Sequence, residues 1–388
     1  MRCNFFYLNT FSVTLYKSVK DLPEQWSTLS SENIFLSKEY LAVLENTSPK
    51  NMNCIFIGVF KNNALCGIFV SQYLNLTKVE TFGERDKQLK THLRNLTLRN
   101  FCSHVLFIGN NMLSGQNAYV FSKNIAKEIQ TEILELVVNK LITHYAVNKI
   151  KIHLTSIKDF SSNTANSLQE FGLKDYYKFS TQPNMVFYIN NNWHKEEDYI
   201  NALTKKYRDQ YKRARNKANG IEKKKLNLTE IIENQECIYN LYLEVAKNAP
   251  FNTFILPKNH FAKLKEELDK NFLFYAYFLN NEMIGFNTLI KNGNVMDTYF
   301  LGYNATIQKE KMLYLNMLYD MVAYSINKGF KEIIFARTAL EIKSSVGAKP
   351  LEMNGFIKHT YKIIDNCLPF LFTYLEPVTE WKERNPFK

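Results

Sequence analysis

The sequence predicts an α/β protein with a mixed β-sheet, in which one module occurs twice. The first observation is a repeated hairpin pattern, because residues 54–72 resemble residues 272–290 after a shift of 218 positions. The second is the order of the patterns that follow: both copies lead to a long helix, a strand, a short helix and a final strand. The third is the length of 388 residues, which suffices for two domains with separate cores.

The elements expected in the first half are a helix over 36–44, the first hairpin, a long helix over 125–145, a strand over 149–154, a short helix over 165–171 and a strand over 185–189. The hairpin turns at Asn62-Asn63, and asparagine tolerates the left-handed backbone of such turns. The long helix is predicted because apolar residues recur at three- and four-residue spacing from Ile129 to Ile142.

The elements expected in the second half are helices over 204–218, 235–247 and 258–268, the second hairpin, a strand over 295–303, a helix over 309–328, a strand over 332–336, a short helix over 339–346 and a strand over 359–364. The second hairpin turns at Asn280-Asn281, as the first does at its own pair of asparagines. Lys328-Gly329 ends the long helix with a cation and a glycine cap. Gene duplication explains this order, and it predicts an N-terminal module over 1–190 and a C-terminal module over 191–388.

The composition is that of a folded protein without a metal centre. Hydrophobic residues make up 46% of the chain and charged residues 22%, which excludes disorder as the main state. The six cysteines and seven histidines lack the spacing of zinc ligands, so we expect no metal. Polar residues interrupt the N-terminal apolar run, and no stretch of 18 apolar residues occurs. We therefore expect a cytoplasmic protein with no membrane span.

Two segments of the C-terminal half carry a resemblance to a known family. LTKKYRDQYKRARNKANG (203–220) is similar to a basic entry helix, and residues 298–350 are similar to a strand–helix–strand followed by a lysine-bearing helix before a glycine. This order resembles the GNAT N-acyltransferase fold. Two such modules in tandem resemble the Fem-type aminoacyltransferases of peptidoglycan bridge formation and the BioF2-like acetyltransferases. The N-terminal half carries the resemblance only in its element order and its hairpin.

The resemblance implies an N-acyltransferase whose active cleft lies mainly in the C-terminal module. The donor it implies is acetyl-CoA or another acyl-CoA, and the acceptor is an amine on a small molecule, a sugar or a cell-wall precursor. One departure is clear: residues 303–311 lack the glycine-rich turn with which CoA-dependent members grip pyrophosphate. Lys309 and Lys311, at the start of the predicted helix, are the candidates to bind the cofactor phosphates in its place; solvated lysines are the alternative.

Acyl transfer to an amine needs a base, a group that stabilises the oxyanion, and substrates held in line. Asp297 and Tyr299 share a strand face with Val295 and Leu301 by the two-residue period, which makes Asp297 a candidate base. A salt-bridged aspartate and a core tyrosine are the alternatives. In the family, Tyr299 matches a tyrosine that contacts the acceptor. Lys343 matches the lysine at the reaction centre, which stabilises the developing oxyanion; a surface lysine is its alternative.

Further candidates are expected to bind substrate. Arg337 and Glu341 directly follow a strand, and residues in this position commonly line the cleft of an α/β protein. Arg337 would bind a carboxylate or phosphate, or form an ion pair with Glu341. Asn316 lies on the long helix that precedes this strand. Arg208 and Arg213 loosely match the acceptor-binding region of the family.

Residues 204–225 carry ten lysines and arginines and two acids, a net charge of +8 within a chain of +12. Tyr207, Tyr211 and Ala214 recur at helical spacing, so this stripe should pack, while Arg208, Lys212, Arg213 and Arg215 stay solvated. Such a surface suits an anionic or nucleotide-linked acceptor, or tRNA. Two alternatives to the acyl-CoA reading therefore stand: an aminoacyl-tRNA-dependent Fem-type transferase, and a non-catalytic module that binds nucleic acid or glycan. The absent glycine-rich turn favours the tRNA donor.

Overall fold

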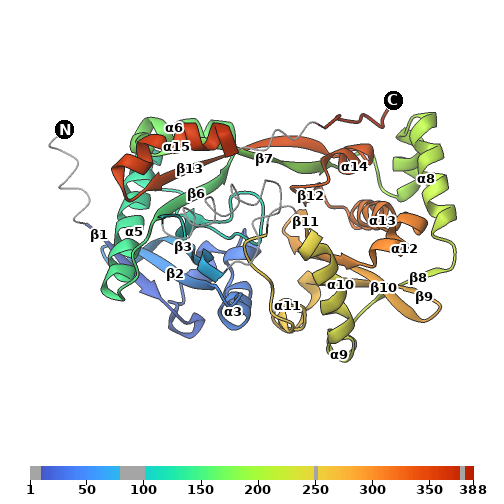
Figure 1. Ribbon diagram of the computed structural model, residues 1–388, viewed down its shortest axis with the longest axis horizontal. Helices are drawn as coiled ribbons and strands as arrows, with labels where there is room; N and C mark the ends of the chain where they lie inside the picture. The colour runs from blue at the N-terminus through green and yellow to red at the C-terminus, as the bar shows by residue number, and fades with distance from the viewer. Residues whose placement is uncertain (1–9, 79–100, 249–251, 376–380) are drawn as a thin grey trace, which may run out of the picture. The chain divides into compact units, whose positions relative to one another are not determined.

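The computed structural model describes residues 10–78, 101–248, 252–375 and 381–388, and the chain forms two compact units (Figure 1). The first unit comprises Met1–Thr181, Pro250–Pro257 and Glu352–Val378, and the second comprises Gln182–Ala249, Lys258–Leu351 and Thr379–Lys388. Each unit combines helices with strands that pair in both parallel and antiparallel directions. The predicted α/β class is therefore confirmed.

In the first unit the strand order is β1-β2-β3-β4-β6-β13, and β5 pairs with β3. These strands are β1 (Phe11–Tyr16), β2 (Met52–Lys61), β3 (Ala64–Asn75), β4 (His104–Ile108), β5 (Tyr119–Phe121), β6 (Leu154–Phe160) and β13 (Lys349–His359). The helices are α2 (Trp26–Leu29), α3 (Lys38–Thr47), α5 (Lys127–Val147), α6 (Ser162–Phe171) and α15 (Lys362–Leu375). Only β4 and β6 run parallel among the pairs described here.

In the second unit the strand order is β7-β12-β11-β10-β9-β8. These strands are β7 (Tyr177–Tyr188), β8 (Ile221–Lys225), β9 (Phe272–Leu279), β10 (Glu282–Asn292), β11 (Val295–Tyr303) and β12 (Glu332–Ala336). The helices are α7 (Glu196–Ala202), α8 (Lys205–Lys217), α9 (Leu228–Glu233), α10 (Gln235–Asn248), α11 (His260–Leu268), α12 (Ala305–Lys311), α13 (Leu313–Asn327) and α14 (Leu340–Ser345). Here β11 and β12 form the parallel pair.

Both predicted hairpins are present, and their turns have the backbone that the asparagines predict. Asn62 and Asn63 have φ angles of 50° and 65°, and Asn280 and Asn281 have φ angles of 51° and 66°. Two consecutive left-handed residues match the right-handed twist of the flanking strands. The repeated sequence pattern therefore reports a repeated structure.

The last strand of each sequence half joins a sheet built mainly from the other half. β7 ends the predicted module 1–190, yet it pairs with β12, with Tyr188 opposite Glu332. β13 lies in the predicted module 191–388, yet it pairs with β6, with His359 opposite Leu154. The predicted modules are continuous segments of the sequence. The compact units instead exchange their last strands, so their residue ranges differ from those of the modules.

Three elements differ from the sequence expectation. The strand expected over 149–154 begins only at its last residue, as β6. The strand expected over 359–364 does not form, because β13 ends at His359 and α15 begins three residues later. The helix expected over 309–328 is divided into α12 and α13 by Met312, whose φ of 51° is left-handed. Short apolar alternations fit a strand and a helix end equally well, so tertiary packing decides between them.

Helices cover both faces of the second unit's sheet. A side chain in place of Gly285 would meet Leu313 and Met317 of α13, so this face packs on α13. A side chain in place of Gly302 would meet α10 at Leu241, so the opposite face packs on α10. In the part of the chain that the structure describes, no helix is long and apolar enough to cross a membrane.

Candidate active site at the separation of β11 and β12

The parallel strands β11 and β12 pair over only three residues. The last pair is Asp297 with Ile334, after which β11 continues to Tyr303 and β12 to Ala336. The carboxyl ends of parallel strands are where α/β sheets commonly bind ligands. The second unit therefore has a candidate site where this pairing ends.

A β-bulge lies in β11 just beyond this point. Leu289 pairs with Thr298 and Asn287 pairs with Leu301, so Tyr299 and Phe300 both lie opposite Thr288. The Thr288 hydroxyl donates a hydrogen bond of 2.5 Å to the Phe300 carbonyl. Bulges re-aim side chains and are frequent next to active sites. The bulge also corrects the expected alternation: it shifts Leu301 off the face that it was predicted to share with Asp297.

Asp297 is a buried carboxyl group with an unusual protonation equilibrium. Its side chain is 7% exposed, and Oδ2 accepts no hydrogen bond from the described residues. Burial raises its pKa to about 7, and the nearby Glu332 carboxylate adds to this effect, although a hydrogen bond from Asn292 opposes it. A carboxyl group with this pKa can exchange a proton near neutral pH.

Tyr299 has a partner that the sequence did not indicate. Its hydroxyl lies 3.0 Å from Nε2 of His260, and the two rings are stacked with centroids 5.9 Å apart. His260 is fully buried at the start of α11. Histidine is the most common general acid–base residue. Sequence reasoning missed it because 39 residues separate the pair, and no local motif links α11 to β11.

Lys343 is buried against the end of β12. Its Nζ donates hydrogen bonds to the carbonyls of Arg337, at 2.6 Å, and Ala336, at 3.2 Å. Burial lowers its pKa to about 7. An ammonium group has three donors, so these two bonds leave one for another acceptor.

The loop held by Lys343 has an unusual backbone. Ala336, Thr338 and Ala339 have φ angles of 58°, 67° and 48°, in the left-handed region that residues with a side chain rarely adopt. Such strain concentrates at functional sites and persists where the surroundings enforce it. Arg337 lies in this loop, and burial lowers its pKa to about 10. The hydrogen bonds from Lys343 are therefore part of what fixes the Arg337 backbone.

Glu341 and Asn316 have structural partners. The exposed Glu341 carboxylate forms an ion pair with Arg384 in the C-terminal segment. Asn316 is buried; its Nδ2 donates to the Ala214 carbonyl at 2.9 Å, and its Oδ1 accepts from Arg215 at 3.3 Å. These contacts join α13 to α8.

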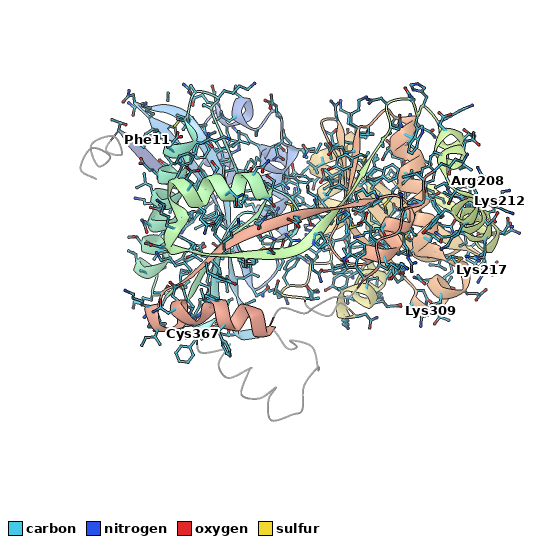
Figure 2. The ribbon with its side chains drawn as sticks, turned by 90° about the horizontal axis from the view of Figure 1, so that it is seen from above. Phe11, Arg208, Lys212, Lys217, Lys309 and Cys367 are labelled. Carbon is cyan, nitrogen blue, oxygen red and sulfur yellow. The ribbon has the colours of Figure 1, made fainter. Side chains whose placement is uncertain are left out.

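The basic helix α8 exposes only some of the cations that were predicted to be solvated. Lys212 and Arg213 are exposed and Arg208 is half-buried, and Figure 2 labels Arg208, Lys212 and Lys217 on α8. Arg215 was expected to be solvated, and this expectation is wrong. It donates to Asp320 at 2.7 Å and to Glu196 at 2.9 Å. The outer surface of α8 therefore has one cation fewer than the sequence predicted.

Lys309 and Lys311 lie in the last turn of α12, not at a helix start as predicted. The first backbone N–H groups of α12 already have hydrogen-bond acceptors. Asn304 Oδ1 accepts from the N–H groups of Thr306 and Ile307, and Glu244 accepts from the Ala305 N–H at 3.1 Å. A carboxylate at this position disfavours a phosphate. The two lysines instead precede the start of α13, where Met312 supplies no side-chain cap.

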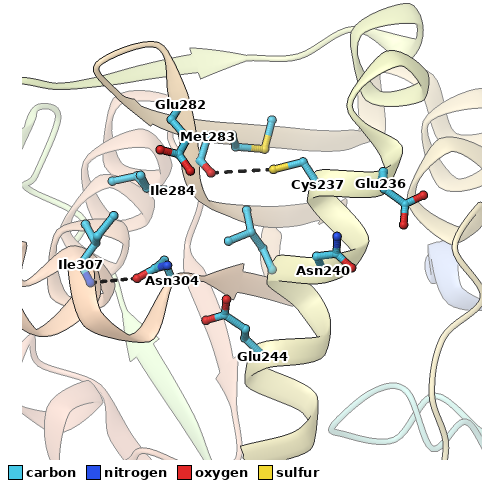
Figure 3. Close-up of a pocket in the computed structure, with 10 residues that line it drawn as sticks. Glu236, Cys237, Asn240, Glu244, Glu282, Met283, Ile284, Asn304 and Ile307 are labelled. Atoms are coloured by element: carbon cyan, nitrogen blue, oxygen red, sulfur yellow. Dashed lines mark hydrogen bonds between the residues drawn. The ribbon is translucent and has the colours of Figure 1, made fainter.

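A separate pocket of about 410 Å³ lies between α10, the start of β10 and α12 (Figure 3). Three of its lining residues are the carboxylates Glu236, Glu244 and Glu282. None of the predicted site residues lines it. Its acidic lining does not suit an anionic donor such as CoA. We therefore place the candidate site at the strand separation and not in this pocket.

Most of the predicted residues lie in one of two regions of the second unit. Asp297 and Tyr299 lie on β11 where the pairing ends, and Lys343 and Arg337 are joined to each other by a hydrogen bond just after β12. Asn316 belongs with α8 and its arginines. Among the described residues, no group of histidine, cysteine or acidic side chains is arranged to hold a metal.

Comparisons with solved structures show the fold. The crystal structure of FemX matches with a TM-score of 0.54 at 10% sequence identity, over 92% of this chain and 99% of FemX. A tandem GNAT protein from the clavulanic acid biosynthesis pathway matches with a TM-score of 0.50 at 7% identity, over 90% of this chain and 98% of that protein. No protein-family model matches the chain, and no curated protein resembles it in sequence. The chain therefore has a tandem GNAT-like fold that resembles the fold of Fem-type transferases.

Proposed function

We propose that the protein is an N-acyltransferase that transfers an acyl group from acyl-CoA to an amine, at the separation of β11 and β12. The observation that carries this proposal is the set of buried titratable side chains carried by β11 and by the residues that follow β12. Asp297 and Lys343 both have pKa values of about 7, and Tyr299 is hydrogen-bonded to His260. Groups that exchange protons near neutral pH are what amine acylation requires.

The roles follow from the position and chemistry of each side chain. In its ionised form Asp297 accepts the proton that the attacking amine must lose. The third donor of Lys343 stabilises the oxygen that becomes negative as the amine attacks the carbonyl carbon. His260 orients the Tyr299 hydroxyl, which positions the acceptor or protonates the leaving thiolate. The acceptor in this proposal is a small molecule, a sugar or a cell-wall precursor, and Arg337 would bind an anionic group on it.

The donor would place its phosphates at the start of α13. Helix starts attract phosphate because their N–H groups point outward and the helix dipole is positive there. Lys309 and Lys311 immediately precede this helix and would add positive charge. We also propose that the protein acts in the cytoplasm, where acyl-CoA is made.

The test is acyl transfer by the purified chain with acetyl-CoA and a panel of amines, measured as release of free thiol. We expect Lys343→Met and Tyr299→Phe to reduce kcat by about 10²–10⁴-fold, since each removes a group that acts in the transition state. Lys349→Met is the matched control, because Lys349 is half-exposed and pairs with Glu383. Full activity in Lys343→Met and Tyr299→Phe would contradict the assignment of the site.

The exposed cations of α8 favour a second candidate, an aminoacyl-tRNA-dependent transferase. Arg208, Lys212 and Arg213 lie on α8, and Lys309 lies on the neighbouring α12. Phosphate backbones bind such clusters with a steep dependence on salt. Lys212→Glu combined with Arg213→Glu should weaken tRNA binding and flatten its salt dependence, whereas Lys174→Glu with Lys178→Glu in the first unit should not.

Binding and stability measurements test for a non-catalytic role. RNA or glycan binding without turnover of any donor would favour a binding module that kept the fold. Thermal stabilisation by acetyl-CoA would favour the acyl-CoA enzyme, because a ligand at a hundred times its Kd adds about 2.7 kcal/mol. Transfer from charged tRNA, with no effect of acetyl-CoA, would favour the second candidate.

A further inference from the structure

Helix α15 carries apolar side chains on its outer surface. Ile363 is 82% exposed and Phe370 is 74% exposed, and Cys367 between them is also exposed. Successive residues of a helix are 100° apart, so positions 363, 367 and 370 fall on one side. Leu368, on another side, is buried. Thus α15 packs on the first unit through one face and presents an apolar stripe on another.

Aromatic and basic side chains extend this stripe beyond the start of α15. Tyr361 is 40% exposed and packs edge-on against Phe101, which is 42% exposed. Lys151 places Nζ 2.8 Å from the Tyr361 hydroxyl and 4.2 Å from the centre of its ring. Lys362 is exposed at the first position of the helix. We call this surface the α15 patch, and it consists of Phe101, Lys151, Tyr361, Lys362, Ile363 and Phe370.

None of the six described residues that define the patch is acidic. Asp365, an acid in the first turn of α15, is half-buried. It accepts a hydrogen bond of 2.6 Å from the His359 N–H, at the end of β13. The Asp365 carboxylate is therefore hydrogen-bonded to the end of β13. The charged side chains of the patch itself are Lys151 and Lys362.

We propose that the α15 patch binds the surface of an anionic phospholipid bilayer. An amphipathic helix lies in the interface with its apolar side among the acyl chains and its lysines at the headgroups. Tyrosine is enriched at the same depth because its ring is apolar and its hydroxyl is polar. The two lysines complement anionic headgroups, and this complementarity favours a lipid surface over an uncharged protein groove. The contact is peripheral and does not depend on the proposed acyl transfer.

The test is co-sedimentation of the full chain with vesicles, at two lipid compositions. Vesicles of phosphatidylcholine and phosphatidylglycerol should bind the chain, and vesicles of phosphatidylcholine alone should bind it more weakly. Ile363→Ser combined with Phe370→Ser should lower the partition coefficient for the anionic vesicles about tenfold or more, since two large apolar side chains are lost. Lys151→Gln combined with Lys362→Gln should abolish the preference for anionic lipid and leave the weaker binding in place.

The matched control is Val147→Ser combined with Ile232→Ser, which removes two exposed apolar side chains outside the patch, 78% and 54% exposed. This control should bind vesicles as the wild type does. Absence of vesicle binding by the wild type overturns the proposal, as does equal loss in the control. Self-association that Ile363→Ser/Phe370→Ser abolishes, without any vesicle binding, would show that the patch joins two copies of the chain instead.

Discussion

The side-chain nitrogen of Lys343 donates a hydrogen bond to the backbone carbonyl of Arg337 over 2.6 Å. The bond links α14 to the loop that leaves β12, in which three residues have left-handed backbone. Lys343 therefore fixes the backbone of the candidate site and, with its lowered pKa, changes charge near neutral pH. Both properties follow from placing one amine in a buried position against carbonyl groups.

The pH dependence of transfer should show two limbs close to neutral pH. If Asp297 accepts the proton of the amine, the rate rises with pH through about 7 as Asp297 ionises. If the Lys343 cation stabilises the oxyanion, the rate falls as pH increases through about 7 and Lys343 loses its proton. A narrow bell-shaped profile of kcat/KM is therefore expected.

The two limbs can be assigned by substitution. Asp297→Asn should remove the rising limb and Lys343→Arg should remove the falling limb, because arginine stays protonated. Measurement of kcat/KM from pH 5 to pH 9 checks both. A flat profile in the wild type would show that neither group titrates during turnover.

Replacement of Asp297 by asparagine should stabilise the protein above neutral pH. The raised pKa means that the folded chain keeps a proton which the unfolded chain releases above about pH 4. The wild type therefore loses stability as pH rises from about 4 to about 7. Asp297→Asn removes this loss, and we expect a gain of about 1–4 kcal/mol in the free energy of unfolding at pH 8.

Urea denaturation at pH 4.5 and pH 8 measures this effect. Glu341→Gln serves as the control, because its carboxylate is exposed on the surface of the same unit. A larger gain at pH 4.5 than at pH 8 would contradict the proposed protonation of Asp297.

The Arg215–Asp320 pair should contribute strongly to the attachment of α8. Arg215 is 28% exposed and Asp320 is 16% exposed, and the same aspartate accepts from the Tyr277 hydroxyl at 2.9 Å. Arg215→Met removes the cation shared by Asp320 and Glu196 and leaves Asp320 with Lys223, at 3.4 Å. We expect a loss of about 2–4 kcal/mol in the free energy of unfolding.

A double-mutant cycle with Asp320→Asn isolates the pair, with an expected coupling of about 1–3 kcal/mol. The equivalent cycle for Lys349 and Glu383, both 44% exposed, should give less than about 1 kcal/mol. Equal coupling energies for the two pairs would show that burial does not strengthen the Arg215 contact.

The first unit should lose stability in mild acid at a pair of histidines. His104 and His153 have ring centroids 5.0 Å apart, and burial lowers the pKa of both. Below about pH 6.5 these two histidines therefore bind protons in the unfolded chain more readily than in the folded chain. Stability is complete above this pH and falls as pH decreases below it.

Hydrogen exchange of the β6 amides at pH 5.5 and pH 7.5, corrected for intrinsic rates, measures this local stability. The groups that face the pair include Lys151, His359 and the Tyr73 hydroxyl, which lies 2.6 Å from Nδ1 of His104. His153→Gln should reduce the difference between the two pH values. Unchanged protection at pH 5.5 in the wild type would contradict the prediction.

Local patterns in the sequence predicted most of the elements of the fold. The strands Val295–Tyr303 and Glu332–Ala336 have the predicted bounds, and the Asn-Asn turns have the predicted backbone. The candidate site could be predicted only in part. Asp297 and Tyr299 follow from their alternation on one strand, whereas His260 contributes through a contact across 39 residues that no local pattern contains.

Hydrophobic periodicity and turn chemistry act over a few residues, so the sequence by itself determined the repeated hairpins, the order of elements and the positive charge of residues 204–225. Tertiary structure decided what depends on distant partners. It paired β7 and β13 with strands of the opposite half, and it turned Arg215 from a solvated cation into a half-buried partner of Asp320. It also set the pKa values of Asp297 and Lys343, because burial acts through the whole surrounding volume and not through neighbours in the chain.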